Sequence, residues 1–288
     1  MKRLGIIVNM QRPEAEPTVT AIKRWADTQG WPVVATERID LVRKPDDHGI
    51  PGGVFDDRVD LLLALGGDGT ILTAVRTAAP FGAPVLGINL GTLGFLSAVS
   101  SELAVAALDR IRVGDYRIEE RLMLQVSERE RTGESWSGLN DIVLDKGGIA
   151  RMARFHVSLN GEFVSQFDGD GLIAATPTGS TAYSLSVGGP ILMPTMNAFV
   201  LAPISPHTLA QRPMVFADTD HLEVTVSSAA GSVMLTVDGQ RTRELEHGTS
   251  VEIARSPHSA RLIDFSDRSF LKVLREKLHW GIGPAGKT

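Results

Sequence analysis

The sequence predicts a parallel α/β domain followed by a mostly β domain, and three observations support this prediction. Apolar runs alternate with helical patterns over the first hundred residues, as in a parallel sheet with crossover helices. From about Tyr116 to about Arg261, period-two alternation and hairpin signals dominate. A last helical pattern, at 267–279, is expected to pack back on the first domain. We therefore divide the chain into residues 1–115, completed by 262–288, and residues 116–261.

The elements of the first domain follow from its apolar runs and stop signals. Residues 17–28 carry Val19, Ile22 and Trp25 at helical spacing, and Gly30 ends this helix. A second helix is expected at 70–79. The expected strands are 4–8, 32–35, 61–65 and 84–89.

In the second domain, Asn160-Gly161 between two alternating runs predicts a hairpin with a type I′ turn. Residues 222–226 and 233–237 are expected to form another hairpin, closed by 229–231.

Composition excludes several classes of protein. No apolar run approaches the ~18 residues that a membrane span needs. The basic start, Met1 to Arg3, precedes an apolar run too short for a signal peptide, so this run is read as a first strand. The net charge of -5 argues against nucleic-acid binding. The absence of cysteine excludes disulfides and thiolate metal sites and favours a cytoplasmic location.

The loop Gly66-Gly67-Asp68-Gly69-Thr70 lies between a buried strand and a helix, an arrangement typical of phosphate binding. A carboxylate beside phosphates is expected only where it does chemistry or holds a metal, so Asp68 is the first candidate for catalysis. A plain turn is the alternative. The loop lacks the Gly-Lys-Ser/Thr of a Walker motif and the G-x-G-x-x-G of dinucleotide-binding folds.

A second cluster runs from Asp170 to Ser184 and contains Thr-Pro-Thr-Gly-Ser-Thr followed by Ala182 and Tyr183. Its small residues would let a flat ring approach the backbone, and Tyr183 offers a ring face or a hydroxyl. The alternative is a helix capped by Ser180 or Thr181, with Tyr183 in the core.

Two weaker signals and two absent motifs complete the survey. Asn140-Asp141 precedes an apolar strand, and the pair suits a diol because both side chains accept hydrogen bonds from hydroxyls. Asp238-Gly239-Gln240 is read first as a hairpin turn. The seven histidines show no metal-ligand spacing, so no metal site built from protein side chains is assigned. No Gly-x-Ser-x-Gly motif is present.

Taken together, these motifs resemble the NAD kinases, which phosphorylate NAD to NADP. The resemblance covers most of the chain, and the 176–183 element is its most specific part. The Gly-Gly-Asp-Gly loop is less specific, because phosphofructokinases and lipid kinases have similar loops. The matching segments are 66–70, 91–96, 139–141, 170–190 and 203–209.

The resemblance implies a Rossmann-like α/β domain and a β-sandwich, with the last helix returning to the first domain. Asp68 would be the general base that accepts the proton of the ribose 2′-hydroxyl. Gly66, Gly67, Gly69 and Thr70 would hold the donor phosphates of ATP or polyphosphate, with Mg²⁺ bound mainly through those phosphates. The residues implied to bind NAD are Asp68, Gly69, Phe95, Asn140, Asp141, Arg151, Asp168, Asp170, Thr181, Ala182, Tyr183, Ser186 and Gln240.

The sequence departs from the family pattern at two positions. Asp141 replaces the usual Glu and is one methylene shorter. Asp168 stands where some members have Arg or a small residue, and a carboxylate there cannot pair with a phosphate. The sequence therefore leaves three points open: whether the donor is ATP or polyphosphate, whether the substrate is NAD or NADH, and whether NADP or NADPH inhibits the enzyme by feedback. The resemblance also implies a homo-oligomer, a dimer or a tetramer.

Two other functions compete with an NAD kinase. A lipid or sugar-alcohol kinase would use the same glycine-rich loop, but the 176–183 element argues against it. A non-catalytic NAD(P)-binding sensor would gain nothing from Asp68 beside phosphates.

Overall fold

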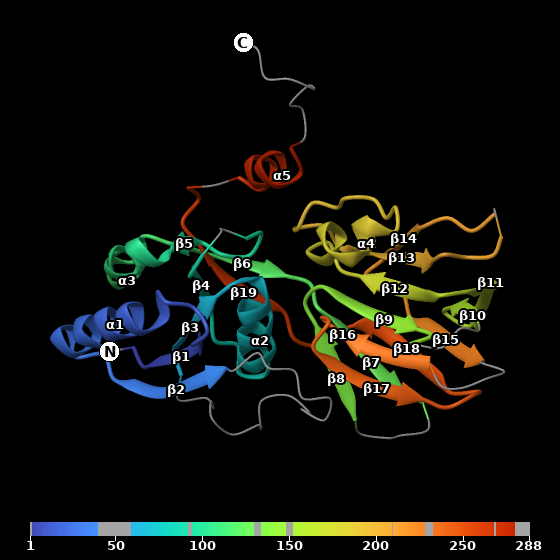
Figure 1. The fold of residues 1–288 in the computed structure, drawn as a ribbon, viewed down its shortest axis with the longest axis horizontal. Coiled ribbons are helices and arrows are strands. Elements are labelled where there is room, and N and C mark those ends of the chain that lie inside the picture. The colour runs from blue at the N-terminus through green and yellow to red at the C-terminus, as the bar shows by residue number, and fades with distance from the viewer. Residues whose placement is uncertain are drawn as a thin grey trace, which may run out of the picture. The chain divides into compact units, whose positions relative to one another are not determined.

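The computed structural model describes residues 2–39, 59–91, 94–129, 134–147, 152–208, 210–227, 233–267 and 269–279 (Figure 1). The chain divides into two compact units. Among the described residues, the first unit contains those up to 120 and those from 261 onward, and the second contains residues 121–260. The first unit is α/β and the second is built on antiparallel sheets, which confirms the predicted fold class.

A seven-stranded sheet forms the centre of the first unit. Six strands follow in the order β2-β1-β3-β4-β19-β6, and β5 pairs with β4. The strands are β1 (Leu4–Asn9), β2 (Val33–Ile39), β3 (Leu61–Gly66), β4 (Val85–Asn89), β5 (Val99–Ser100), β6 (Arg117–Arg121) and β19 (Ala260–Asp264). Because β3 and β4 are parallel neighbours, the loops that follow them lie at the same edge of the sheet.

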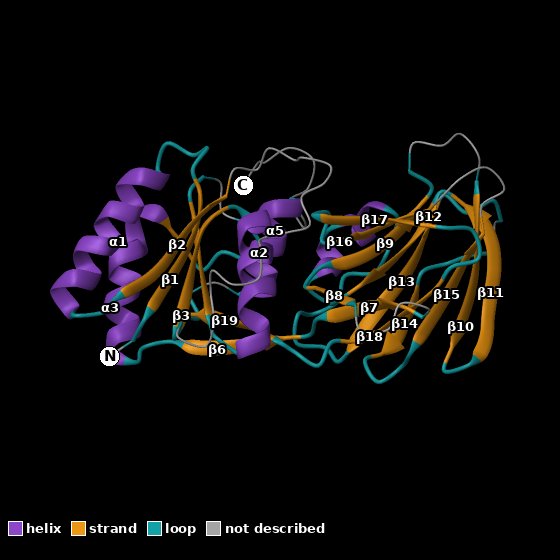
Figure 2. Cartoon of the chain, turned by 90° about the horizontal axis from the view of Figure 1, so that it is seen from below, coloured by secondary structure: helices purple, strands orange, loops and turns teal. Residues whose placement is uncertain are grey.

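Helices cover both faces of this sheet. Figure 2 shows α1 and α3 on one face and α2 on the other. Every residue of β1 and β3 is therefore buried, which explains their uninterrupted apolar runs. The helices are α1 (Ala15–Gln29), α2 (Asp68–Ala78), α3 (Ala104–Val113) and α5 (Phe270–Leu278), with 3₁₀ turns η1 (Ala79–Phe81) and η2 (Ser101–Leu103). In the described part of the chain, no helix is long and apolar enough to cross a membrane.

The ends of two helices test the predicted boundaries. Helix α1 ends at Gly30, whose φ of 65° is left-handed, as a C-terminal glycine predicts. Helix α2 begins at Asp68, two residues before the predicted start, because Gly67 already serves as the extended N-cap residue. The glycine-rich loop is therefore shorter than its sequence indicates, and Asp68 belongs to the first helical turn.

The second unit consists of two six-stranded sheets. We name them the β10 sheet, in the order β11-β10-β15-β18-β7-β8, and the β12 sheet, in the order β14-β13-β12-β9-β16-β17. The strands are β7 (Leu124–Glu128), β8 (Ser135–Gly138), β9 (Asp141–Asp145), β10 (Ala153–Leu159), β11 (Glu162–Gly169), β12 (Gly171–Ala175), β13 (Ala198–Ile204), β14 (Met214–Ala217), β15 (Leu222–Ser227), β16 (Val233–Val237), β17 (Arg241–Leu245) and β18 (Ser250–Arg255).

Alternating side chains of the β12 sheet pack into two different cores. Ile142 and Leu144 of β9 join residues of both sheets in the main core, which includes Phe155 and Phe199. Val143, between them, points to the other face of the β12 sheet. That face is covered by the segment after β12, through residues such as Leu192. This segment contains the 3₁₀ turn η3 (Gly179–Thr181) and the short helix α4 (Tyr183–Ser186).

One predicted hairpin is confirmed and the other is wrong. Asn160 and Gly161 have φ values of 52° and 84° and join β10 to β11, as a type I′ turn requires. The strands β15 and β16 do not pair, because β15 belongs to the β10 sheet and β16 to the β12 sheet. Their apolar faces meet across the main core instead. Alternation predicts which face of a strand is buried but leaves its partner strand open.

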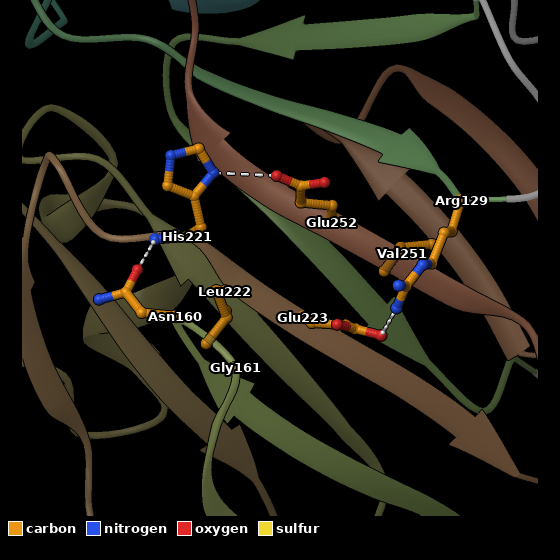
Figure 3. A pocket seen from close by; sticks show the side chains of 8 residues that line it. All are labelled: Arg129, Asn160, Gly161, His221, Leu222, Glu223, Val251 and Glu252. Carbon is orange, nitrogen blue, oxygen red and sulfur yellow. Dashed lines mark hydrogen bonds and ion pairs between the residues drawn. The ribbon is translucent and has the colours of Figure 1, made fainter.

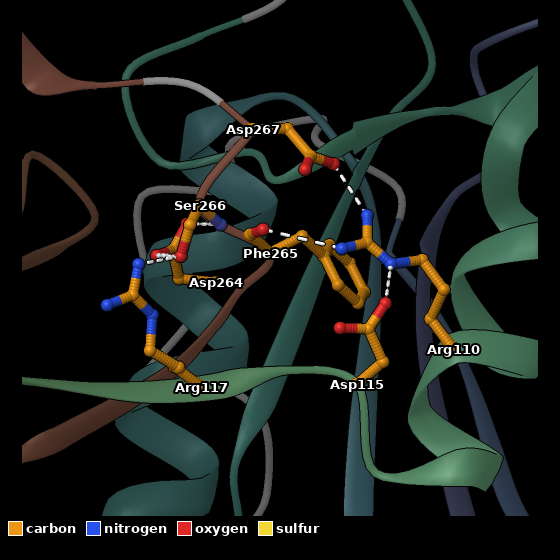
Figure 4. Close-up of polar contacts among 7 residues, drawn as sticks. All are labelled: Arg110, Asp115, Arg117, Asp264, Phe265, Ser266 and Asp267. Atoms are coloured by element: carbon orange, nitrogen blue, oxygen red, sulfur yellow. Dashed lines mark hydrogen bonds and ion pairs between the residues drawn. The ribbon is translucent and has the colours of Figure 1, made fainter.

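The segment after β19 is fastened to the first unit by Arg110 at the end of α3 (Figure 4). The Arg110 guanidinium contacts the carboxylates of Asp115 at 2.7 Å and Asp267 at 2.6 Å, and lies 4.5 Å from the ring centre of Phe265. Arg117 also donates to the hydroxyl of Ser266. The helix predicted at 267–279 is α5, which begins after Ser269, whose hydroxyl accepts from the N–H of Lys272.

Candidate functional site

The carboxyl edge of the parallel sheet carries Gly66, Gly67 and Asp68. Gly66 ends β3, Gly67 is extended with φ −91° and ψ −172°, and Asp68 opens α2. The first N–H groups of an α-helix have no partner within the helix and form the positive end of its dipole. The arrangement therefore suits an anion such as a phosphate.

Backbone groups from the loop after β4 hold the carboxylate of Asp68. The N–H of Phe95 donates to Oδ2 at 2.9 Å, and the N–H of Leu96 donates to Oδ1 at 3.2 Å. This turn is itself braced by Ser97, whose Oγ accepts from the N–H of Gly94 at 3.1 Å. A Cβ on Gly94 would lie only 2.0 Å from Oδ1 of Asp68. The position of the carboxylate is thus set by backbone atoms of a second loop.

Thr70 lies beneath the glycine-rich loop. Its side chain is 1% exposed, and its Oγ1 has no hydrogen-bond partner among the residues that the structure describes. A Cβ on Gly66 would come within 2.2 Å of this oxygen. The close packing explains why the loop begins with glycine.

In the second unit, Asn140 and Asp141 stand at the start of β9, as the sequence predicts. Their backbone N–H groups are bound by Asp238, in the turn between β16 and β17. Oδ1 of Asp238 accepts from Asn140 at 2.7 Å and from Asp141 at 3.3 Å, and Oδ2 accepts from Leu139 at 3.1 Å. In return, the N–H of Asp238 donates to the carbonyl of Asp141 at 2.9 Å.

The side chain of Asp141 is almost fully buried, at 6% exposure. Burial, followed by the neighbouring charge of Asp238, raises the pKa of Asp141 from 3.8 to about 7. Two neighbouring buried carboxyl groups favour protonation of one. Asp141 is therefore a group that changes charge near neutral pH.

The Thr-Pro-Thr-Gly-Ser-Thr element packs against the same peptide units. The hydroxyl of Thr176 donates to the carbonyl of Leu139, and the N–H of Thr176 donates to the carbonyl of Asn140 at 2.9 Å. The N–H of Gly179 closes the turn by donating to Oγ1 of Thr176 at 3.1 Å. A Cβ on Gly179 would lie 2.0 Å from the Asn140 carbonyl oxygen. Asn140 is thus held on its N–H side by Asp238 and on its carbonyl side by Thr176.

The residues after this element present an open surface. Tyr183 begins α4 and is 44% exposed, so the alternative that placed it in the core is wrong. Partial burial, then the charges of Asp145, Asp170 and Asp141, raise the pKa of its hydroxyl. Neither Ser180 nor Thr181 caps a helix, which corrects the capping prediction. Their hydroxyls instead donate to the carbonyls of Pro177 and Thr178, at 2.6 Å and 3.2 Å.

Comparison with known proteins places these arrangements in a family. Residues 4–116 match the ATP-NAD kinase N-terminal domain, and residues 139–265 match the ATP-NAD kinase C-terminal domain. A curated NAD kinase from Moorella thermoacetica is 41% identical over 98% of this chain and 90% of its own length. One from Heliobacterium modesticaldum is 40% identical over 98% of this chain and 100% of its own length. The chain belongs to the NAD kinase family.

Two solved structures of the family have the same fold. A crystal structure of yeast NADH kinase complexed with NADH has a TM-score of 0.83 at 25% identity, covering 100% of this chain and 90% of its own. An NAD kinase from Archaeoglobus fulgidus in complex with ATP has a TM-score of 0.74 at 24% identity, covering 96% of this chain and 98% of its own. As a member of this family the chain is an enzyme, a kinase.

The remaining residues that the NAD kinase resemblance indicates are placed as follows. Asp168 forms a two-point pair with Arg154 across β10 and β11, with N–O distances of 2.6 and 2.9 Å. Asp170 pairs with Lys146 at 2.7 Å. Gln240 lies in the β16–β17 turn, and its N–H donates to the carbonyl of Val237 at 3.0 Å. Ala182 and Ser186 flank Tyr183 at the two ends of α4. Arg151 lies outside the described residues.

The structure also shows a surface pocket on the β10 sheet (Figure 3). Its rim carries two polar pairs, His221 hydrogen-bonded to Glu252 at 2.9 Å and Arg129 in an ion pair with Glu223 at 2.7 Å. Their side chains are exposed, so solvent screens both pairs. The pocket contains none of the residues expected to bind NAD or a phosphate donor.

Sequence reasoning missed Asp238 and the glycines Gly94 and Gly179. Asp238 was read as part of a hairpin turn, and its φ of 53° shows that it does occupy one. Its second role, as acceptor for three backbone N–H groups, leaves no mark in the local sequence. The glycines are needed because of contacts with Asp68 and Asn140, which lie far away along the chain.

Proposed function

We propose that this member of the NAD kinase family transfers a phosphoryl group from ATP or polyphosphate to the 2′-hydroxyl of the adenosine ribose of NAD, giving NADP. The O2′–P bond forms, the bond between the transferred phosphorus and its leaving oxygen breaks, and the hydroxyl proton passes to Asp68. Family membership and the near full-length identity to curated NAD kinases support this proposal.

The position of Asp68 is the observation on which the proposed mechanism rests. Each of its two oxygens accepts one backbone N–H, so the plane of the carboxylate is fixed while each oxygen keeps a lone pair for a substrate hydroxyl. A carboxylate is a weak base for an alcohol. Its contribution is therefore orientation of the hydroxyl and late acceptance of the proton, about 10²–10⁴-fold in rate.

We place the donor phosphates at the start of α2, on Gly66, Gly67, Gly69 and Thr70. There the helix N-terminus offers positive charge and the glycines allow close approach. Mg²⁺ would be bound mainly through the donor phosphates, which leaves the carboxylate of Asp68 to accept the hydroxyl proton. When bound, the ion would neutralise charge that develops on the donor oxygens.

We assign NAD recognition to the resemblance-derived residues, chiefly Asn140, Asp141 and Tyr183. Within the second unit, three observations support this assignment. Asn140 is held from both sides, Tyr183 is exposed, and the charges of Asp141 and Asp170 act on the Tyr183 hydroxyl. We extend the assignment to Phe95, whose backbone already contacts Asp68. We further propose a cytoplasmic enzyme that forms a homodimer or homotetramer, to be tested by light scattering.

The test is formation of NADP from NAD with Mg²⁺, using ATP and polyphosphate in separate reactions. We compare the wild type with Asp68→Asn and with Asp27→Asn, a control at an exposed position on α1. Loss of at least 10²-fold in kcat in Asp68→Asn only, with NAD binding retained, supports Asp68 as the base. Equal turnover in Asp68→Asn and wild type contradicts that role. Tight NAD binding without turnover with either donor contradicts the proposed reaction.

A further inference from the structure

Asp238 is bound to the backbone of the Asn140–Asp141 segment more extensively than a turn residue needs to be. Four hydrogen bonds join this one residue to three consecutive residues of the other segment, three through its carboxylate and one through its N–H. The residue as a whole is buried, at 7% exposure. A buried carboxylate requires such donors, so the three N–H groups and Asp238 depend on each other.

The arrangement replaces a regular strand pairing. β9 and β16 are paired up to Val237 opposite Ile142. At Asp238 the chain turns, with positive φ at Asp238 and at Gly239, and leaves the ladder. The side chain of Asp238 then takes over the donors of residues 139–141, which would otherwise lack a strand partner at this point. It thereby sets the path on which Asn140 and Asp141 enter β9.

We infer that Asp238 is a positioning residue for NAD recognition, which fixes the direction of the Asn140 and Asp141 side chains toward the ribose. This inference rests on the proposed function, because it takes Asn140 and Asp141 as ligands of NAD. The hydrogen bonds of Asp238 described above are made to the backbone of this segment. Its effect is on the affinity for NAD and leaves the donor site of the first unit unchanged.

Replacement of Asp238 by Asn tests this inference with almost no change in shape. An amide has one acceptor oxygen, so its NH₂ group faces at least one N–H of residues 139–141 without an acceptor. We expect the KM for NAD to rise about 10- to 100-fold, which is the range expected for loss of charge-assisted hydrogen bonds. The KM for the phosphate donor should change less than about twofold, and kcat less than KM for NAD. Asp238→Glu, which keeps both oxygens, should recover part of the NAD affinity.

The pH profile gives a readout that a merely structural residue would not move. Two causes raise the pKa of Asp141, its own burial and the charge of Asp238. The charge of Asp141 in turn contributes to the raised pKa of Tyr183 in α4. The residue opposite Asp141 on β12 is Ala175, which is uncharged. Asp238→Asn removes the smaller of the two causes that raise the pKa of Asp141. Because Asp141 is a proposed ligand of NAD, we expect its titration to give an inflection in the KM for NAD near neutral pH in the wild type, and in Asp238→Asn this inflection should move to lower pH.

The matched control is Asp220→Asn. Asp220 also lies in a turn between two strands of the second unit, and it also accepts a backbone N–H, from Ala217 at 3.0 Å. This control should leave the KM for NAD within about twofold of wild type. Thermal unfolding of each variant shows whether it is folded. If Asp238→Asn does not unfold cooperatively, Asp238→Glu carries the test: its longer side chain should leave the KM for NAD above the wild-type value, and a wild-type KM would overturn the inference.

The possible outcomes separate this inference from the proposed function. An unchanged KM for NAD and an unmoved inflection in folded Asp238→Asn overturn the inference alone, as does an equal rise in Asp220→Asn. A parallel rise in KM for NAD and for the donor indicates a general structural role and also overturns it. A wild type that neither binds NAD nor forms NADP overturns the proposed function, and the inference with it.

Discussion

Replacement of Gly94 by Ala should displace the carboxylate of Asp68 and lower kcat, although Asp68 itself is not mutated. The added Cβ would lie 2.0 Å from Oδ1, 2.5 Å from Cγ and 2.6 Å from Oδ2 of Asp68. Real Cβ atoms essentially never come within 3.0 Å of a heavy atom outside their own and the adjacent residues, so the carboxylate or the turn must shift by about 1 Å. The contacts from Phe95 and Leu96 belong to the same turn and stretch with it.

The magnitude follows from the role proposed for Asp68. Misplacement of a catalytic group by about 1 Å can cost about 10²-fold in rate, which corresponds to about 2.7 kcal/mol in the barrier. Weakening two hydrogen bonds to a half-buried carboxylate should lower the free energy of unfolding by about 1–3 kcal/mol. This is less than the roughly 5–15 kcal/mol of a typical domain, so the variant should remain folded.

The assay is kcat for NADP formation at saturating NAD and donor, with thermal unfolding measured in parallel. Gly91→Ala is the control from the same loop, because the nearest atoms to its Cβ are at 3.8 Å or more and should accommodate it. It should keep kcat within about twofold of wild type. A Gly94→Ala enzyme with wild-type kcat would refute the claim that the 94–96 turn fixes a catalytic carboxylate. A loss of activity only where the protein is unfolded would refute it as well.

Two further predictions concern the second unit. Gly179→Ala places a Cβ 2.0 Å from the carbonyl oxygen of Asn140, a backbone atom that cannot rotate away as a side chain can. The affinity for NAD, measured by calorimetry, should therefore fall at least about 10-fold. An unchanged affinity would contradict the packing of Gly179 against Asn140. Asp141 ionises near pH 3.8 when unfolded and near 7 when folded, so stability should fall as pH rises between these values. Between pH 5 and 7.5 denaturant titrations should show a loss of about 2–3 kcal/mol in wild type relative to Asp141→Asn, and parallel slopes in the two proteins would contradict the raised pKa.

Local features of the fold could be predicted from sequence because few residues decide them. Asn160-Gly161 specifies its turn within two positions, since both must adopt positive φ. Gly30 ends α1 for a similar reason. The strand partners of β15 and of β16 could not be predicted in this way, because the two strands belong to different sheets. Both strands have an apolar face, and whether these faces lie in one sheet or oppose each other across a core depends on ten other strands.

The candidate site also contains some residues that the sequence indicates and others that only the fold explains. Asp68 was found because a carboxylate inside a glycine-rich loop is chemically unusual. Asn140 and Asp141 were a weak signal, as a pair that suits a diol, and the family resemblance then assigned them to NAD. The groups that hold them were missed. Asp238 is 97 residues from Asp141, and a turn aspartate that binds three distant N–H groups has the same local sequence as one that binds none. Only the fold brings these groups together.

Asp68 and Asp238 also share a physical device, although they belong to different units. Each carboxylate is bound by consecutive backbone N–H groups, two for Asp68 and three for Asp238. Backbone donors fixed in a folded loop have much less freedom than long cationic side chains, which lose rotamer entropy when they bind a carboxylate. They also bring no full positive charge to the proposed catalytic and NAD sites. As a consequence, glycine is necessary where the loop that carries the N–H groups comes closest to the carboxylate. In the first unit this position is Gly94, next to Asp68. Precision at this site therefore depends on the absence of a side chain at Gly94 as much as on the carboxylate itself.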